Sequence, residues 1–131
     1  MNVIIYTNDR GLVSVFEAAL GIKVDENLIS RVVPKEFQGE AVIVDSGAVP
    51  ADKTFRDAWV KSGSTVSVDL ERAKEVAQGR RADTLALNLA LLTIESERQA
   101  AISASAGVEE SINEALSVAE LKNILTVNSI I

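Results

Sequence analysis

PADKTFRDAWVKSGSTVSVDLERAKE, residues 50–75, joins two halves of the chain that differ in character. Before it, short apolar runs rich in Val and Ile are separated by Asn, Asp, Gly and Pro, a pattern typical of strands and turns. After it, good helix formers dominate. We therefore predict an α+β protein, with a small antiparallel β module over residues 1–68 and a helical module over residues 69–131.

The joining stretch itself contains an aromatic pair. Phe55 and Trp59 are two of only five aromatic residues, and their spacing of four predicts that they share one face of a short helix. We expect them to anchor the core, with the alternative that they dock another chain as a hot spot. The alternating STVSV run, residues 64–68, predicts a strand, and Asp69 then suits the N-cap of a following helix.

Composition excludes several classes of function. The 131 residues include no Cys and no His, so the chain lacks thiolate chemistry, disulfides, the commonest zinc ligand and the commonest general base. Nineteen acidic against thirteen basic residues give a net charge of −6, which disfavours nucleic acid as a partner. With 47% apolar but only 4% aromatic residues, the core must be aliphatic. We expect no cofactor and no metal.

Nothing in the sequence predicts a membrane segment or an export signal. The N-terminus lacks the basic start and long apolar core of a signal peptide. No uninterrupted apolar run reaches the roughly 18 residues that a membrane-spanning helix needs.

The first half predicts about four strands, mostly antiparallel. Residues 3–7 and 12–16 are β-branched runs around an Asn-Asp-Arg-Gly turn, which indicates a hairpin. Asp25 is placed to cap a short helix through Arg31, and Pro34 stops that helix. The AVIV run at residues 41–44 predicts a buried strand that joins the hairpin's sheet.

The second half predicts one long helix followed by shorter ones. From Leu70 to about residue 103 only Gly79 interrupts good helix formers, so we expect a kink or division there. Residues 104–107 are the expected turn, and a second helix follows over residues 108–116. The Ser-x-x-Glu pattern at residues 117–120 is a capping box that predicts a third helix ending near Leu125. The β-branched residues 126–131 suit a strand or a packing segment.

A wide apolar arc on the long helix is the main candidate for a functional surface. Leucines fall on two adjacent stripes, so something must cover them. That cover is either the β module folding back, or a second copy or partner helix. The predicted protein-interaction residues are Phe55, Trp59, Leu85, Leu87, Leu89, Leu91, Leu92 and Ile94.

Chemical sites are weaker candidates. The loop carboxylates Asp45, Asp52 and Asp57 would act as acid and base in a small enzyme, but Asp is also ordinary in turns and caps. The glycine patterns that bind phosphate are absent. Four basic residues form the only cationic concentration: Arg72, Lys74, Arg80 and Arg81. They suit a solvated helix face, with contact to an acidic partner or to nucleic acid as the alternatives.

The order Pro-Ala-Asp-Lys-Thr-Phe-Arg-Asp-Ala-Trp, then Val-Asp-Leu-Glu-Arg-Ala-Lys-Glu and the pair Arg80-Arg81, resembles a family of small proteins encoded near the tail genes of tailed bacteriophages and prophages. An N-terminal hairpin and the pair Val33-Pro34 extend the resemblance over residues 1–81, whereas ADTLALNLALLTIE, residues 82–95, departs from it. The resemblance implies a role in the virion or its assembly and transfers no catalytic residue.

We accordingly expect a non-enzymatic virion structural protein, associated with the tail or tail fibre. It would be made in the host bacterial cytoplasm and would act through contacts with other phage structural proteins and with itself as a homo-oligomer. Nucleic acid and membrane are not expected partners. The first alternative is a tail or tail-fibre assembly chaperone that is not retained in the virion, and the second is the small enzyme.

Overall fold

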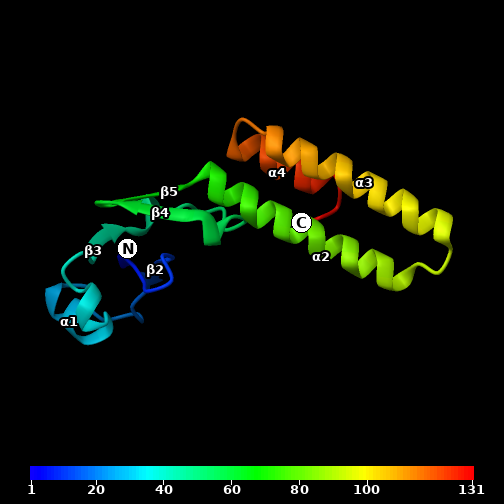
Figure 1. The fold of residues 1–131 in the computed structure, drawn as a ribbon. Coiled ribbons are helices and arrows are strands. Elements are labelled where there is room, and N and C mark those ends of the chain that lie inside the picture. Colours follow the sequence, from blue (N-terminus) through cyan, green and yellow to red (C-terminus); the bar gives the residue numbers. More distant parts are fainter. The chain divides into compact units, whose positions relative to one another are not determined.

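Five β-strands precede three of the four α-helices in the structure, a computed structural model that describes residues 1–131. The chain divides into two compact units, Met1–Asp69 and Leu70–Ile131 (Figure 1). The first unit holds all the strands and the short helix α1, and the second holds α2, α3 and α4. The predicted α+β class, a small antiparallel β region followed by helices, is confirmed.

The first unit is built on a three-stranded antiparallel sheet in the order β2-β1-β3. Its strands are β1 (Asn2–Thr7), β2 (Val13–Phe16) and β3 (Val42–Asp45). The register places Ile5 opposite Val15 on one side and Val42 on the other. The predicted hairpin and the predicted third strand are therefore both confirmed.

The hairpin turn follows from the chemistry of Asn8. Its side-chain Oδ1 accepts hydrogen bonds from the backbone N–H groups of Arg10 and Leu12, at 3.0 and 3.1 Å. Gly11 adopts a φ of +73°, a conformation that side chains disfavour. Asn and Gly are thus both required by the geometry of this turn.

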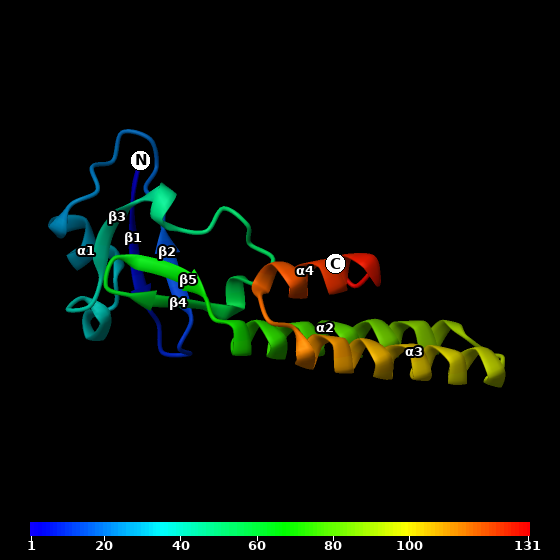
Figure 2. The same ribbon diagram turned by 90° about the horizontal axis from the view of Figure 1, so that it is seen from above.

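Alternate residues of a strand point to opposite sides of a sheet, so this sheet has apolar side chains on both faces. Both faces are covered by other parts of the first unit. On one face, Ile4 packs in a cluster with Leu28, Ile29 and Val33 from α1 (Glu26–Val32) and its C-terminal end. The Asp25 side chain accepts a hydrogen bond from the Leu28 N–H at 3.1 Å, which confirms the predicted cap. Figure 2 shows α1 beside the sheet.

The other face is covered by a second, separate hairpin. Its strands are β4 (Trp59–Ser62) and β5 (Thr65–Val68), joined at Gly63 with φ +60°. Trp59 and Val66 pack there in one cluster with four buried valines and isoleucines of the sheet: Val3, Ile5, Val13 and Val44. The five strands, one more than predicted, thus form a three-stranded and a two-stranded antiparallel sheet.

The prediction of a short helix that carries the aromatic pair is wrong. Only Arg56–Ala58 forms a 3₁₀ turn, and Trp59 is already extended as the first residue of β4. The β-branched and aromatic residues that follow favour a strand and outweigh the local helical spacing. Phe55 and Trp59 nevertheless both become buried.

The second unit is an antiparallel pair of long helices with a shorter third. The helices are α2 (Leu70–Leu91), α3 (Glu95–Glu114) and α4 (Val118–Val127), and α4 contacts both of the others. Ser117 caps α4 as predicted, since its Oγ accepts the Glu120 N–H at 3.1 Å.

The predicted helix boundaries before α4 are wrong. Gly79 lies inside α2 and residues 104–107 lie inside α3, so neither is a break. The chain turns instead at Leu92-Thr93-Ile94, where Ile94 is extended with φ −89° and ψ 122°. The β-branched residues Thr93 and Ile94 favour extended backbone there. The link contains no Gly or Pro, so the sequence gives no local signal of a turn.

The C-terminal strand expectation is wrong as well. The α-helix α4 continues to Val127 and ends with Ser129 at a φ of 57°. The Ile130 N–H donates to the Leu125 carbonyl at 2.9 Å and the Ser129 N–H to the Thr126 carbonyl at 3.1 Å. These two bonds define a Schellman C-cap, in which the left-handed position is usually Gly.

Replacing Ser129 with Gly should stabilise the helical unit. A side chain in the left-handed region costs about 1–2 kcal/mol, and subtracting the entropy that Gly adds to the unfolded chain leaves a gain of about 0.5–1 kcal/mol. Urea unfolding followed by far-UV circular dichroism measures this gain. The variant Ser129→Ala keeps the Cβ and should match the original chain; a stabilisation by Ala equal to that by Gly would contradict the explanation.

Candidate functional site

The aromatic pair is not available to another chain. Phe55 has 3% and Trp59 1% of its surface exposed. The expectation that they act as a docking hot spot is therefore corrected, and the alternative that they belong to the core holds. Arg56 lies over the Trp59 ring, 5.7 Å from its centroid, and adds a cation–π contact at the edge of this core.

The leucine arc of α2 divides into a covered and an open stripe. Leu85, Leu89 and Leu92 are half-buried. By contrast, Leu87, Leu91 and Ile94 have 67%, 81% and 55% of their surface exposed. We name these three residues the leucine ridge. Within the helical unit, neither α3 nor α4 covers the ridge, so this part of the predicted interaction surface is exposed there.

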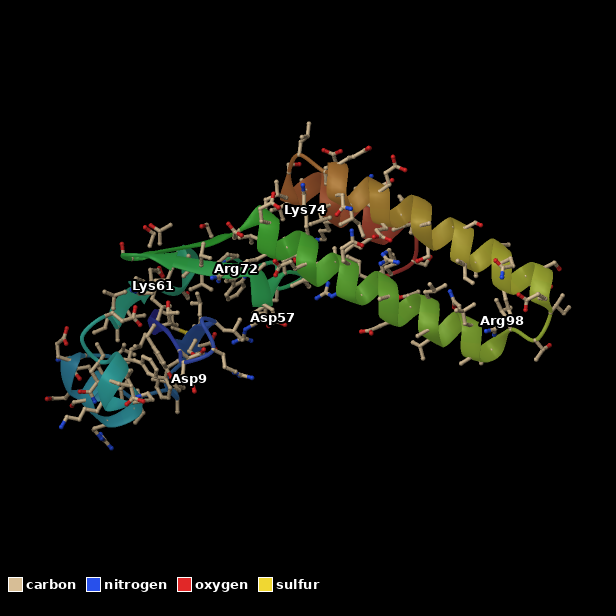
Figure 3. All side chains as sticks on the ribbon, in the orientation of Figure 1. Asp9, Asp57, Lys61, Arg72, Lys74 and Arg98 are labelled. Atoms are coloured by element: carbon tan, nitrogen blue, oxygen red, sulfur yellow. The ribbon has the colours of Figure 1, made fainter.

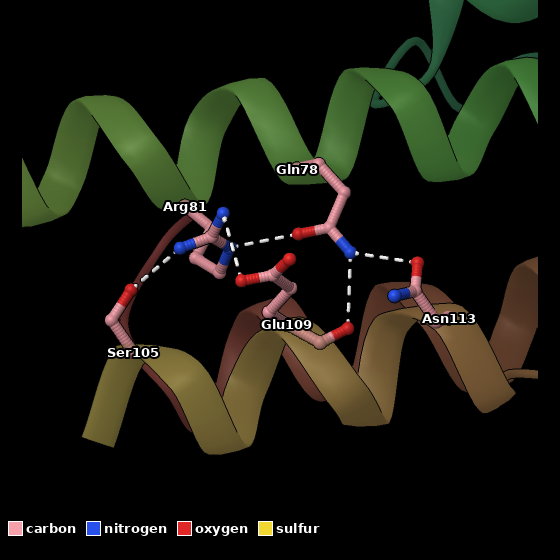
Figure 4. Close-up of polar contacts among 5 residues, drawn as sticks. All are labelled: Gln78, Arg81, Ser105, Glu109 and Asn113. Carbon is pink, nitrogen blue, oxygen red and sulfur yellow. Dashed lines mark hydrogen bonds and ion pairs between the residues drawn. The ribbon is translucent and has the colours of Figure 1, made fainter. Parts of the chain in front are cut away.

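A polar seam joins α2 and α3 ahead of the leucine-rich half of α2. Figure 4 shows five side chains meeting between the two helices. Gln78 Nε2 donates to the Glu109 carbonyl and to Asn113 Oδ1, each at 3.0 Å. Arg81 Nη1 donates to Ser105 Oγ at 2.8 Å, and Arg81 Nη2 lies 3.6 Å from the Glu109 carboxylate. The contact with α3 is therefore polar at Gln78 and Arg81, whereas further along α2 the half-buried residues are Leu85, Leu89 and Leu92.

The two helices also cap each other's C-terminal ends. The last carbonyls of a helix have no partner within it and must be satisfied from outside. Arg98 of α3 donates through Nη1 to the carbonyls of Leu89 and Leu92 at the end of α2, the latter at 3.1 Å. Lys74 of α2 donates to the Asn113 carbonyl near the end of α3 at 2.9 Å. Figure 3 shows Arg98 at the end of the hairpin where the two helices join.

The third helix covers only one half of this hairpin. In both ribbon views α4 lies beside the start of α2 and the end of α3 (Figures 1 and 2). Just beyond α4, a hollow of about 140 Å³ separates its C-terminal end from the two long helices. The hollow is lined by Arg81, Thr84, Leu85, Asn88, Ala101, Ala104, Ser105, Val108, Asn128 and Ile130.

The basic residues of α2 have different roles. Lys74 and Arg81 turn toward α3, and their side chains are each only 16% exposed. Arg72 is exposed and Arg80 half-buried. The four residues therefore do not form one cationic surface. Lys74 and Arg81 hold the hairpin together, a use that the sequence analysis did not anticipate.

The loop carboxylates lie at separate points of the first unit. Asp45 pairs with the N-terminal ammonium at 3.6 Å, and Asp52 accepts the backbone N–H of Thr54 at 3.0 Å. Asp57 is exposed in the 3₁₀ turn (Figure 3). None of the three lines the surface cavities of about 540, 140, 510 or 260 Å³, and no group of His, Cys, Asp or Glu side chains is arranged to hold a metal ion.

A groove on the surface of the first unit lies near charged groups. It has about 540 Å³ and a floor that includes Val3, Val15, Val49 and Val66. An adjoining cavity of about 260 Å³ shares Glu17 and Lys53 with it and reaches Arg56 and Trp59. Its rim carries both charges, so it does not single out an anionic or a cationic ligand.

Comparison with protein-family models, with curated proteins and with solved structures finds no match for this chain. None of its helices combines the length and the apolar character that crossing a membrane requires. The leucine ridge, held in place by the polar seam and the helix caps, is therefore the feature on which a functional proposal rests.

Replacing Arg98 with Met should loosen the hairpin end that carries the ridge. The change keeps an apolar stem but removes the donor to two carbonyls, and we expect the free energy of unfolding of the helical unit to fall by about 1–2 kcal/mol. Arg98→Lys keeps the charge but has one compact donor group. Its free energy of unfolding should lie between those of Arg98→Met and the original chain. Urea unfolding by far-UV circular dichroism gives the values.

Emission of the single tryptophan, Trp59, provides an internal control because it reports on the first unit alone. The transition followed by Trp59 should stay at the same urea concentration in both Arg98 variants. Equal stability of Arg98→Met and the original chain would show that the caps are unimportant.

Proposed function

We propose that this chain is a non-enzymatic structural protein of a bacteriophage particle, associated with the tail or tail fibre, that works through protein–protein contacts. The observation that carries the contact role is the leucine ridge, because large exposed apolar side chains grouped on one surface mark interaction sites. The resemblance of residues 1–81 to small phage tail-region proteins supports the particle as the setting.

The uncharged segment of the chain that carries the ridge supports a lasting contact over a transient one. Residues 84–94 contain no ionisable side chain. Stable assemblies have apolar interface cores from which charged residues are depleted. A chain used repeatedly in a particle would bury such a surface permanently, through contacts repeated by symmetry.

An assembly chaperone is the first rival. It would use the same ridge to hold a tail protein in the infected cell and then leave. The ridge fits both roles, so the proposals differ in where the chain is found after assembly.

The small enzyme is the second rival. It requires carboxylates that converge on a substrate. Asp45 and Asp52 are engaged in local contacts, and Asp57 lies at the surface. Alanine at these three positions should therefore leave the biological role of the chain intact, whereas an enzyme would lose activity while remaining folded.

Purified particles of the phage or induced prophage that encodes this chain should contain it, as measured by quantitative mass spectrometry. We expect Leu87→Lys combined with Leu91→Lys to reduce incorporation at least tenfold, because two buried ammonium groups would each lack a partner. Leu116→Lys is the matched control, since Leu116 is 85% exposed in the same unit and outside the ridge. Presence in infected cells but absence from particles would favour the chaperone.

A further inference from the structure

We propose that the leucine ridge is covered by the same ridge of a second copy of this chain, with the two helical hairpins packed antiparallel about a two-fold axis. The inference rests on the proposed function only in taking the ridge as a protein contact. It adds the identity of the partner and the geometry of the pair.

The ridge continues the face of the hairpin on which α4 packs. Thr84 and Asn88 of α2 line the hollow at the end of α4, together with Ile130. Leu87 and Leu91 follow Thr84 by three and seven residues, the spacings that keep side chains on one face of a helix. The face that α4 covers along one half of the hairpin is therefore open along the other half.

Small residues border the ridge on the neighbouring helix. Ala101 and Ala104 line the same hollow from α3, and Ala100 lies one turn from Ala104. A helix can approach these alanines closely, since each side chain is a single methyl group. The open half thus combines protruding leucines on α2 with a low strip on α3, a surface suited to another helical hairpin.

The charge pattern of α2 points to a second copy as the occupant. Residues 84–94 have no charge to pair with an acidic or basic partner, so the surface matches another uncharged apolar helix, and the chain itself supplies one. All seven ionisable residues of α2 come before this segment: Glu71, Arg72, Lys74, Glu75, Arg80, Arg81 and Asp83. Pairing open half with open half keeps these charges out of the contact.

The position of α4 fixes the relative direction of the two hairpins. If they ran parallel, the α4 helices of both copies would meet on the same face and hold the ridges apart. If they run antiparallel, each α4 lies beyond the end of the other copy's hairpin, and Leu87 of one copy faces Leu91 of the other. The result is a four-helix contact between the open halves, closed at each end by one α4.

One charged residue of the half that α4 leaves open, Glu97, gives a way to test self-pairing. Glu97 lies four residues before Ala101, so it shares the face of α3 that borders the ridge. A two-fold axis brings Glu97 of both copies to the same contact, where like charges oppose association. Removing that charge should strengthen pairing of the chain with itself.

Sedimentation equilibrium of the full chain tests the pairing. We expect dimers at micromolar concentration and at least tenfold weaker association for Leu87→Lys and for Leu91→Lys, with circular dichroism unchanged. Leu116→Lys should associate like the original chain, and Glu97→Gln should associate more tightly. A monomer at 100-fold higher concentration than the expected range, or equal weakening by Leu116→Lys, would overturn the proposal.

A spin label tests the direction. The chain has no cysteine, so Glu75→Cys on the exposed side of α2 gives a single labelling site. At 1.5 Å per residue, labels fourteen residues from an axis between Leu87 and Leu91 lie about 40 Å apart in the antiparallel pair. A distance below about 20 Å would indicate parallel hairpins and reject the arrangement.

The two proposals fail separately. A monomeric chain that still enters particles, and loses entry when the ridge carries lysines, would keep the structural role and place a different protein on the ridge. A dimer that is absent from particles would keep the pairing and reject the virion role.

Discussion

Reciprocal capping of two helix ends is the constraint on which the helical unit depends. Arg98 reaches back to carbonyls of α2, and Lys74 reaches across to a carbonyl of α3. Because each long helix supplies the cation that completes the other, the two must lie antiparallel and level with each other. The seam formed by Gln78, Arg81 and their partners then fixes the register between the caps.

The polar seam and the exposed leucines lie on different halves of α2. Amide, guanidinium and hydroxyl groups, and not large apolar side chains, occupy the positions where the two helices meet in this seam. The remaining apolar residues of α2 are then divided between the flank and the interior. The leucine ridge is the flank portion: it lies beyond the seam, on the half of the hairpin that α4 does not cover.

Local chemistry made much of the first unit predictable. The turn at Asn8 and Gly11, the Asp25 cap and the alternating strands each depend on residues close in sequence, which a reading of the chain can weigh. The same holds for Ser117 and α4. The prediction of a short helix at Phe55 and Trp59 failed for a physical reason. A helical spacing over a single turn is a weak signal, and Trp59 already belongs to the strand β4.

The helical hairpin was less predictable because its determinants are distant. The turn at Leu92-Thr93-Ile94 contains no helix breaker, and the groups that stabilise it come from Arg98. Likewise, Lys74 and Arg81 look like surface cations until α3 is placed beside them. The open leucines were predictable as a surplus of apolar surface, but their division into covered and exposed stripes required the position of α3.

The composition of the helical core links assembly to stability. Of its six fully buried apolar residues, three are alanines, so the unit gains little from internal burial: Ala73, Ala77, Ile112, Ala115, Leu121 and Leu125. Leu87 and Leu91 of α2 are 67% and 81% exposed and add little to that burial. Any protein that covers the ridge therefore stabilises the folded hairpin by mass action, since only the folded form presents the ridge in a bindable geometry. Under the proposed pairing, folding of this unit and its assembly are two parts of one equilibrium.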